Sequence, residues 1–184
     1  FIDSLAVVKA ADLNKVNTVI DIGTGAGFPG IPLKIAFPHL KITLLDSLNK
    51  RIKFLDEVIR ELGLQEIKTI HGRAEDFAKQ KEYREQYDLC VSRAVANLST
   101  LSEYCLPFVK AGGEFLPYKS GKVEEEAREA ESAVKKLGGS MRETKTLVLP
   151  GTDVDRTFVP IDKINVTPKK YPRKAGMPGK EPLK

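Results

Sequence analysis

The chain has 184 residues, enough for one domain that buries its own core without disulfides or a structural metal. Hydrophobic residues make up 41% and charged residues 30%, a globular rather than a disordered composition, and no apolar run approaches the roughly 20 residues of a membrane helix. The two cysteines, Cys90 and Cys105, lie in separate apolar runs, so we expect neither a disulfide framework nor a metal site. We therefore expect a reducing, cytoplasmic compartment.

The two ends of the chain differ from its middle. Residues 1–15 are interpreted as a helical remnant whose upstream part is missing, because Phe1 is not an initiator methionine and no basic signal peptide follows it. The net charge of +5 is concentrated at the other end, where residues 163–184 hold seven lysines and arginines against one acid. Four prolines in that stretch predict a basic, extended, non-helical arm over residues 165–184, either contacting phosphates or simply solvated.

Short β-rich runs alternate with helical patterns from Val16 onward, which is typical of βαβ units. In the first half we expect strands at 19–22, 42–45, 67–71 and 87–92. Helices are expected at 33–37 and at 50–62, and the second of these has apolar residues at helical spacing and ends at Gly63.

The alternation continues in the second half. Leu98, Leu101, Cys105 and Val109 mark a helix, and a strand at 114–118 and a helix at 123–137 follow it. The last two strands, at 146–149 and 157–164, lack a helix between them. The pattern therefore predicts an α/β fold over residues 16–164, with a mostly parallel, Rossmann-like sheet that carries an antiparallel hairpin at its edge.

Polar residues follow each of the first four predicted strands. Asp21 lies at the first, Asp46 at the second, Ala74 and Glu75 after the third, and Arg93 after the fourth. Singly, Asp46 could cap a helix, Glu75 could favour a helix dipole, and Arg93 could form a surface ion pair. Ligands of parallel sheets bind at the carboxyl ends of the strands, so the placement of all these polar residues at such ends predicts a binding site.

The glycines after the first strand distinguish between cofactors. A dinucleotide fingerprint, G-x-G-x-x-G, would need glycine where Phe28 stands, whereas Gly23, Gly25 and Gly27 form G-x-G-x-G. Preceded by an acid, this pattern is typical of S-adenosylmethionine-dependent methyltransferases. Glycine lets a ligand approach the backbone, Asp46 can accept hydrogen bonds from both ribose hydroxyls, and Phe28 can cover an apolar part of the ligand.

Five segments of the chain resemble a known family. They are VIDIGTGAGFPGIP at 19–32, LLDSLNKRIKFL at 44–55, GRAE at 72–75, SRA at 92–94, and YPRKAGMPGKEPL at 171–183. Together they are similar to the bacterial 16S ribosomal RNA guanine-N7 methyltransferases called RsmG or GidB. The resemblance spans the whole chain and implies a class I methyltransferase fold, S-adenosylmethionine as cofactor, and N7 of a guanine in small-subunit rRNA as acceptor.

The resemblance also implies cofactor contacts, at Gly23, Phe28, Ala74, Glu75 and Arg93, with Asp46 as a further candidate. The chain departs from the family pattern in three places. Met177 replaces a usual threonine, Pro117 and Ser120 alter the surroundings of Lys119, and the family's N-terminal helices are absent before Phe1.

An N7 acceptor needs no catalytic acid or base, because its lone pair already lies in the ring plane and only alignment is required. Arg93 and Lys119, after the fourth and fifth strands, are candidates to hold phosphate or guanine O6, with a structural ion pair as the alternative. Cys90 falls within a strand and is expected in the core rather than as a nucleophile. His39 and His71 are expected to be structural or surface residues.

The expected partner is 16S rRNA or the small ribosomal subunit, bound by a monomer. The expected RNA contacts are Lys119, Lys169, Lys170, Tyr171, Arg173 and Lys174, with Tyr171 able to stack on a base. The arm is expected to act on RNA without touching the cofactor pocket. The residues alone support only a methyltransferase acting on a polyanion. The alternatives are a small-molecule methyltransferase, a non-catalytic RNA-binding assembly factor with a vestigial pocket, and an NAD-dependent oxidoreductase.

Overall fold

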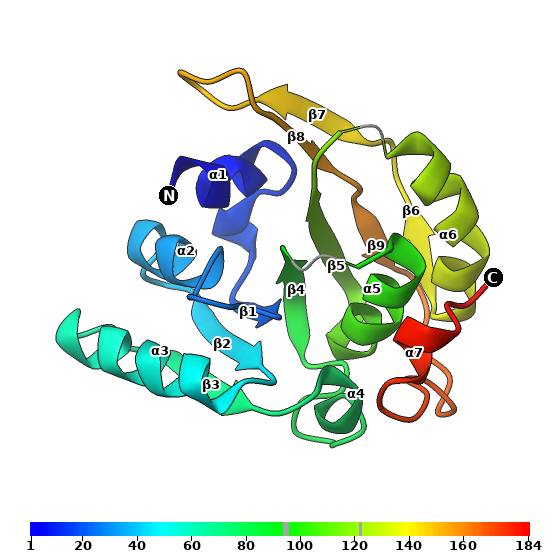
Figure 1. Ribbon diagram of the computed structural model, residues 1–184, viewed down its shortest axis with the longest axis horizontal. Coiled ribbons are helices and arrows are strands. Elements are labelled where there is room, and N and C mark those ends of the chain that lie inside the picture. The colour runs from blue at the N-terminus through cyan, green and yellow to red at the C-terminus, as the bar shows by residue number, and fades with distance from the viewer. Residues whose placement is uncertain (94–95, 122) are drawn as a thin grey trace.

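The computed structural model describes residues 1–93, 96–121 and 123–184 (Figure 1). Its sheet has the order β3-β2-β1-β4-β5-β8-β7. The parallel strands are β1 (Thr18–Ile22), β2 (Lys41–Asp46), β3 (Ile67–His71), β4 (Tyr87–Ser92) and β5 (Val109–Lys119). The chain runs outward from β1 to β3 and returns to β4 on the other side of β1. Strand order therefore reverses between β1 and β4, where an open sheet binds its ligands.

Helices cover both faces of this sheet, which is why its central strands β1, β2 and β4 are almost wholly buried (Figure 1). Neighbouring residues alternate between the two cores: Val19 packs on one face and Ile20 on the other. The first face carries α1 (Ile2–Leu5), η1 (Ala6–Lys9), η2 (Leu13–Lys15), α2 (Gly30–Ala36) and α3 (Asn49–Glu61). The second carries α4 (Ala74–Phe77), α5 (Leu98–Cys105), η3 (Leu106–Phe108) and α6 (Glu124–Lys136). No described helix is both long and apolar enough to cross a membrane.

The structure confirms the alternation of strands and helices and the antiparallel hairpin, which is formed by β7 (Lys145–Val148) and β8 (Asp155–Phe158). Two boundaries differ most from the prediction, apart from α2, which begins three residues earlier than expected. Val109 begins β5 rather than ending a helix, because Pro107 turns the chain into the short η3. The single strand expected at 157–164 is split at Pro160 into β8 and β9 (Ile161–Lys163), and β9 pairs with the unpredicted β6 (Gly139–Met141).

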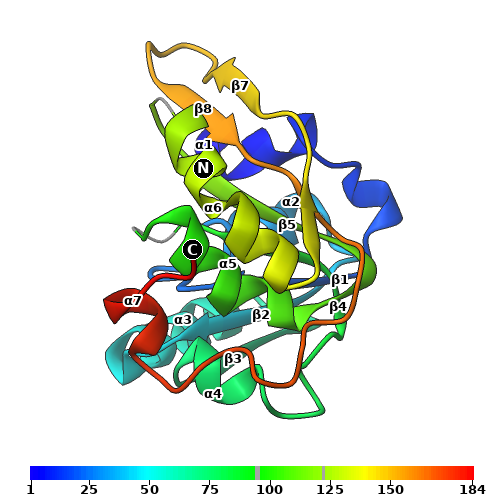
Figure 2. The same ribbon diagram turned by 90° about the vertical axis from the view of Figure 1, so that its right-hand side faces the viewer.

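The C-terminal segment, residues 165–184, runs back along the body rather than away from it (Figure 2). The expectation of a wholly non-helical arm was wrong, because Met177–Lys180 forms the short helix α7 with Pro178 in its first turn, where proline is tolerated. Tyr171 and Pro172 are buried against the body. The segment therefore belongs to the folded structure.

Candidate functional site

A cavity of about 630 Å³ opens at the carboxyl ends of β1 to β4, at the switch point of the sheet. Three groups of residues predicted from the sequence meet in it, namely the glycine loop, the acid after β2 and the residues after β3 and β4. They are Gly23, Gly25, Phe28, Asp46, Ala74, Glu75 and Arg93. The volume falls within the range of small-molecule and cofactor sites.

The loop after β1 brings its backbone to the cavity. Gly23 and Gly25 have φ angles of 69° and 61°, a left-handed conformation that other residues rarely adopt. Nothing lies within 4 Å of a Cβ placed on Gly25, so glycine is required there by conformation rather than by space. Gly27 does not line the cavity; a Cβ there would lie 2.6 Å from Ile31 and 2.9 Å from Leu55, so it allows the loop to pack on α2 and α3.

Asp21 lies beneath this loop and is completely buried. Its Oδ2 accepts hydrogen bonds from Thr24 Oγ1 at 2.7 Å and from the N–H of Gly30 at 2.9 Å. Burial raises the pKa of Asp21 to about 6, although these hydrogen bonds and the nearby Arg93 oppose the shift. Asp21 therefore supports the loop from below and is not among the cavity-lining residues.

Asp46 is almost completely buried at the end of β2, and its carboxylate organises two loops. Oδ2 accepts from the N–H of Gly25 at 2.9 Å, and Oδ1 accepts from the N–H of Leu48 at 2.9 Å. Arg51 of α3 reaches back with Nη1 3.2 Å from Oδ2. Arg51 lines the cavity but was missed in the sequence, where only its position about one helical turn after Asp46 could have suggested it.

Ala74 and Glu75 begin α4 after β3, and both are buried at the cavity wall. Glu75 Oε1 accepts a hydrogen bond of 2.9 Å from the N–H of Gly176, which itself lines the cavity. The expectation that the C-terminal arm leaves the pocket alone was therefore wrong. The two residues are 101 positions apart, and no local pattern links them.

Arg93 lies at the opposite side, after β4. Its guanidinium is centred 5.5 Å from the ring of Phe28, and Nη1 donates to Asp3 Oδ2 at 2.9 Å. Asp3 also accepts from Arg156 Nε at 2.6 Å, so this part of the cavity rim is tied to the N-terminal helix. Ala94, the last residue of the SRA motif, lies outside the described residues.

Three residues expected to contact RNA are held inside the protein instead. Lys119 Nζ lies 2.7 Å from Glu126 Oε1 and 2.7 Å from the carbonyl oxygen of Ala96, so the structural ion pair left open as an alternative is the arrangement observed. Arg173 pairs with the completely buried Glu103, and Tyr171 is only 7% exposed. In contrast, Lys169, Lys170 and Lys174 are exposed.

Cys90 and Cys105 are free and buried, which confirms that Cys90 belongs to the core. His71 Nε2 lies 3.2 Å from the carbonyl oxygen of Ser47, and His39 Nε2 lies 3.1 Å from that of Leu13. Neither histidine is among the described residues that line the cavity.

The sheet order and the cavity at its switch point define a class I methyltransferase fold. Solved structures with this fold include the S-adenosylmethionine-dependent methyltransferase SibL in its apo form, with 17% identity, a TM-score of 0.65, and coverage of 88% of this chain and 55% of that one. M. jannaschii TYW2, solved in complex with AdoMet, has 16% identity and a TM-score of 0.62 over 82% of this chain and 72% of its own. These likenesses concern the fold.

The chain belongs to the rRNA small subunit methyltransferase G family, whose model matches residues 1–156. It is 55% identical over its whole length to the ribosomal RNA small subunit methyltransferase G of Lachnoclostridium phytofermentans, covering 76% of that protein. The protein of the same name from Clostridium tetani is 53% identical, again over the whole chain and 77% of that protein. The predicted family, fold class and enzyme class are therefore confirmed.

Proposed function

We propose that this chain transfers a methyl group from S-adenosylmethionine to N7 of a guanine in the 16S rRNA of the small ribosomal subunit. One observation carries the proposal: the glycine loop, Asp46 and Glu75 converge on one cavity at the sheet's switch point, in a chain of this rRNA methyltransferase family. Family membership does not favour a small-molecule methyltransferase or a non-catalytic assembly factor.

The groups around the cavity fit this cofactor. A carboxylate has about four lone-pair sites. On Asp46 the N–H groups of Gly25 and Leu48 use two, and a ribose diol would take the other two in place of the half-exposed Arg51, whose Nη1 lies 3.2 Å from Oδ2. Glu75 supplies a second buried carboxylate that can accept from the adenine amine. Arg93 offers a cation to the carboxylate of the methionine end. When bound, S-adenosylmethionine supplies an electrophilic methyl group on its sulfonium.

The chain's own residues then have to hold the acceptor in line with that methyl group. Guanine N7 carries no proton, so no general base is needed, and the catalytic contribution is orientation. The ring of Phe28, 5.5 Å from the Arg93 guanidinium, forms a flat apolar surface at the rim of the cavity. Arg93 can donate to guanine O6 or to a phosphate beside it.

The RNA backbone is expected to contact the exposed cations around the cavity. Arg73 is exposed and lines the cavity mouth, and Lys169, Lys170 and Lys174 are exposed on the C-terminal segment. Each phosphate neutralised by such a side chain releases counterions and adds to the affinity for RNA. Arg173 and Tyr171 are no longer expected to contact RNA, because the Arg173 side chain pairs with Glu103 and Tyr171 is buried.

We also propose that the chain acts as a monomer in the cytoplasm, where ribosomal subunits assemble. Two free, buried cysteines suit a reducing compartment. Light scattering at micromolar concentration, alone and with cofactor, should give the mass of a single chain.

The decisive experiment is to map the methylated nucleotide. Small subunits lacking the modification are incubated with the protein and S-adenosylmethionine, and the rRNA is digested and analysed by mass spectrometry. A single 7-methylguanosine in 16S rRNA is the expected product. Methylation at another atom, or binding of subunits without transfer, would overturn the proposal. Naked 16S rRNA is tested in parallel to establish which form of the substrate is accepted.

A further inference from the structure

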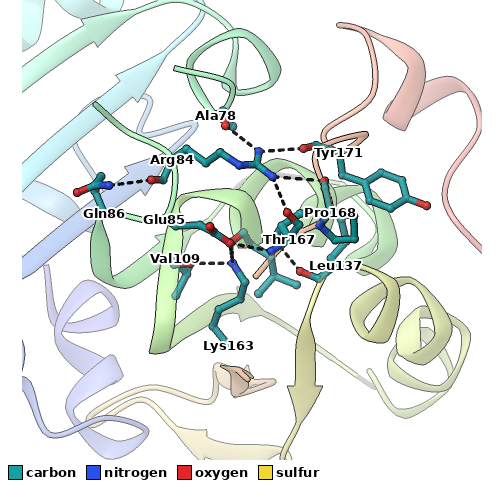
Figure 3. A network of polar contacts seen from close by, with 11 residues as sticks. Ala78, Arg84, Glu85, Gln86, Val109, Leu137, Lys163, Thr167, Pro168 and Tyr171 are labelled. Carbon is teal, nitrogen blue, oxygen red and sulfur yellow. Dashed lines mark hydrogen bonds and ion pairs between the residues drawn. The ribbon is translucent and has the colours of Figure 1, made fainter. Parts of the chain in front are cut away.

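The C-terminal segment is fastened to the body where it begins (Figure 3). Arg84 donates from Nη1 to the carbonyl oxygen of Tyr171 at 2.9 Å and from Nη2 to that of Thr167 at 2.7 Å. Glu85 Oε1 accepts from the N–H of Thr167 at 2.7 Å and from Lys163 Nζ at 3.0 Å. The Lys163 side chain is completely buried, so this anchor extends from the partly exposed Glu85 into the interior.

Helix α5 fastens the segment again on both sides of Gly176. Glu103, completely buried, accepts from the backbone N–H of Arg173 at 2.7 Å, from its Nε at 3.0 Å and from its Nη2 at 2.8 Å. Further along, Thr100 Oγ1 donates to the carbonyl oxygen of Pro178 at 3.0 Å. The charge-assisted hydrogen bonds of Glu103 on one side and the buried Thr100 hydrogen bond on the other hold the chain between them in one position.

That position places Gly176 on the cavity wall. Its N–H donates to Glu75 Oε1 at 2.9 Å, and its φ of 84° is a conformation that suits glycine. Tyr104, the residue after Glu103 on α5, lines the cavity together with Gly176 and Glu75. The same helix therefore supplies part of the wall and holds the segment that supplies the rest.

We propose that the C-terminal segment completes the cofactor site, and that Arg173 and Glu103 are positioning residues that keep Gly176 hydrogen-bonded to Glu75. The inference rests on the proposed function, since S-adenosylmethionine is the ligand. A detached segment would expose Glu75 to water and open one side of the cavity. Cofactor affinity would then fall in proportion to the fraction of molecules with the segment in place, and bound cofactor would hold the segment down by the same factor.

The first test removes the anchor without leaving a buried charge uncompensated. Arg173→Met combined with Glu103→Gln should raise the Kd for S-adenosylmethionine about fivefold or more in calorimetry without RNA, the lower end of usual coupling. Lys135→Met combined with Glu131→Gln removes an exposed ion pair of the same two charges from α6 and should stay within about twofold of the unchanged protein. Arg173→Lys alone, which keeps a positive charge beside Glu103, should bind S-adenosylmethionine more tightly than the double variant does. In turnover with subunits, the double variant should show a raised KM for cofactor with kcat retained.

The second test uses the unchanged protein and needs no variant to fold. Trypsin can cut after the exposed Lys174, in the part of the segment between Arg173 and Gly176. Saturating S-adenosylmethionine should slow this cut about fivefold or more. The cut after the exposed Lys145 in the edge strand β7, which is not among the residues lining the cavity, serves as the internal reference. If calorimetry shows cofactor binding but the cut is not slowed, or the folded double variant binds as tightly as the unchanged protein, the inference is wrong and the proposed function stands. If no cofactor binds at all, the proposed function itself fails.

Discussion

Replacement of Asp46 by alanine tests the assignment of the ribose site. Two hydroxyl groups hydrogen-bonded to a carboxylate contribute about 1.5 kcal/mol each at the lower end, so about 3 kcal/mol is lost, or roughly a hundredfold in Kd. The structure adds a second cost. The N–H groups of Gly25 and Leu48 lose their acceptor, which should lower the free energy of unfolding by about 2 kcal/mol.

The matched control and a second variant separate these effects. Asp56→Ala removes the same charge from α3, where the carboxylate is exposed and bonded to Thr69 Oγ1, and should leave cofactor affinity unchanged. Arg51→Met should leave affinity equal or raise it a few-fold, because the Arg51 guanidinium occupies the oxygens that the ribose diol needs.

The measurements are calorimetric titration with S-adenosylmethionine and urea denaturation of each variant. A folded Asp46→Ala protein whose Kd lies within about threefold of the unchanged one would remove Asp46 from the cofactor site. An Arg51→Met protein that binds more than tenfold more weakly would refute the lone-pair argument, because Arg51 would then be a ligand rather than a competitor.

Three further results are expected. The folded-state pKa of Asp21, about 6, lies above its usual value of 3.8, so the stability that Asp21 contributes is complete below about pH 4 and is lost as the pH rises through 6. Urea denaturation should therefore show a decline of about 3 kcal/mol over this range in the unchanged protein that Asp21→Asn lacks. Equal declines in both proteins would contradict this expectation. The single-turnover rate should vary less than about twofold between pH 6.5 and 8.5, and a bell-shaped profile would reveal a missed acid or base. Replacing Lys169, Lys170 and Lys174 together by glutamine should reduce the slope of log RNA affinity against log salt by about 0.7–0.9 per true phosphate contact, whereas an unchanged slope means none is made.

Much of the site could be predicted from the sequence, because its signals are local. Hydrophobic periodicity distinguishes strands from helices within a few residues, and parallel strands bring their carboxyl ends to one edge of the sheet. Asp46 and Glu75 therefore had to lie near the glycine loop once the strands before them were recognised. The same reasoning led us to expect Arg93 at this edge, where it lines the cavity, but not its contacts with Phe28 and Asp3.

Only the tertiary structure decided which charged residues are available to a ligand. Lys119 and Arg173 carry the positive charge expected of phosphate contacts, but Lys119 is paired with Glu126 of α6 and Arg173 with Glu103 of α5. Arg173 lies 70 residues from Glu103 in the sequence. A cation's role depends on whether a buried carboxylate already pairs with it, and local sequence does not record that pairing. The proline-rich C-terminal segment could likewise be recognised from its residues as irregular and basic, but not where it lies. Its place on the cavity wall, with Gly176 on Glu75, follows from contacts between parts of the chain that only folding brings together.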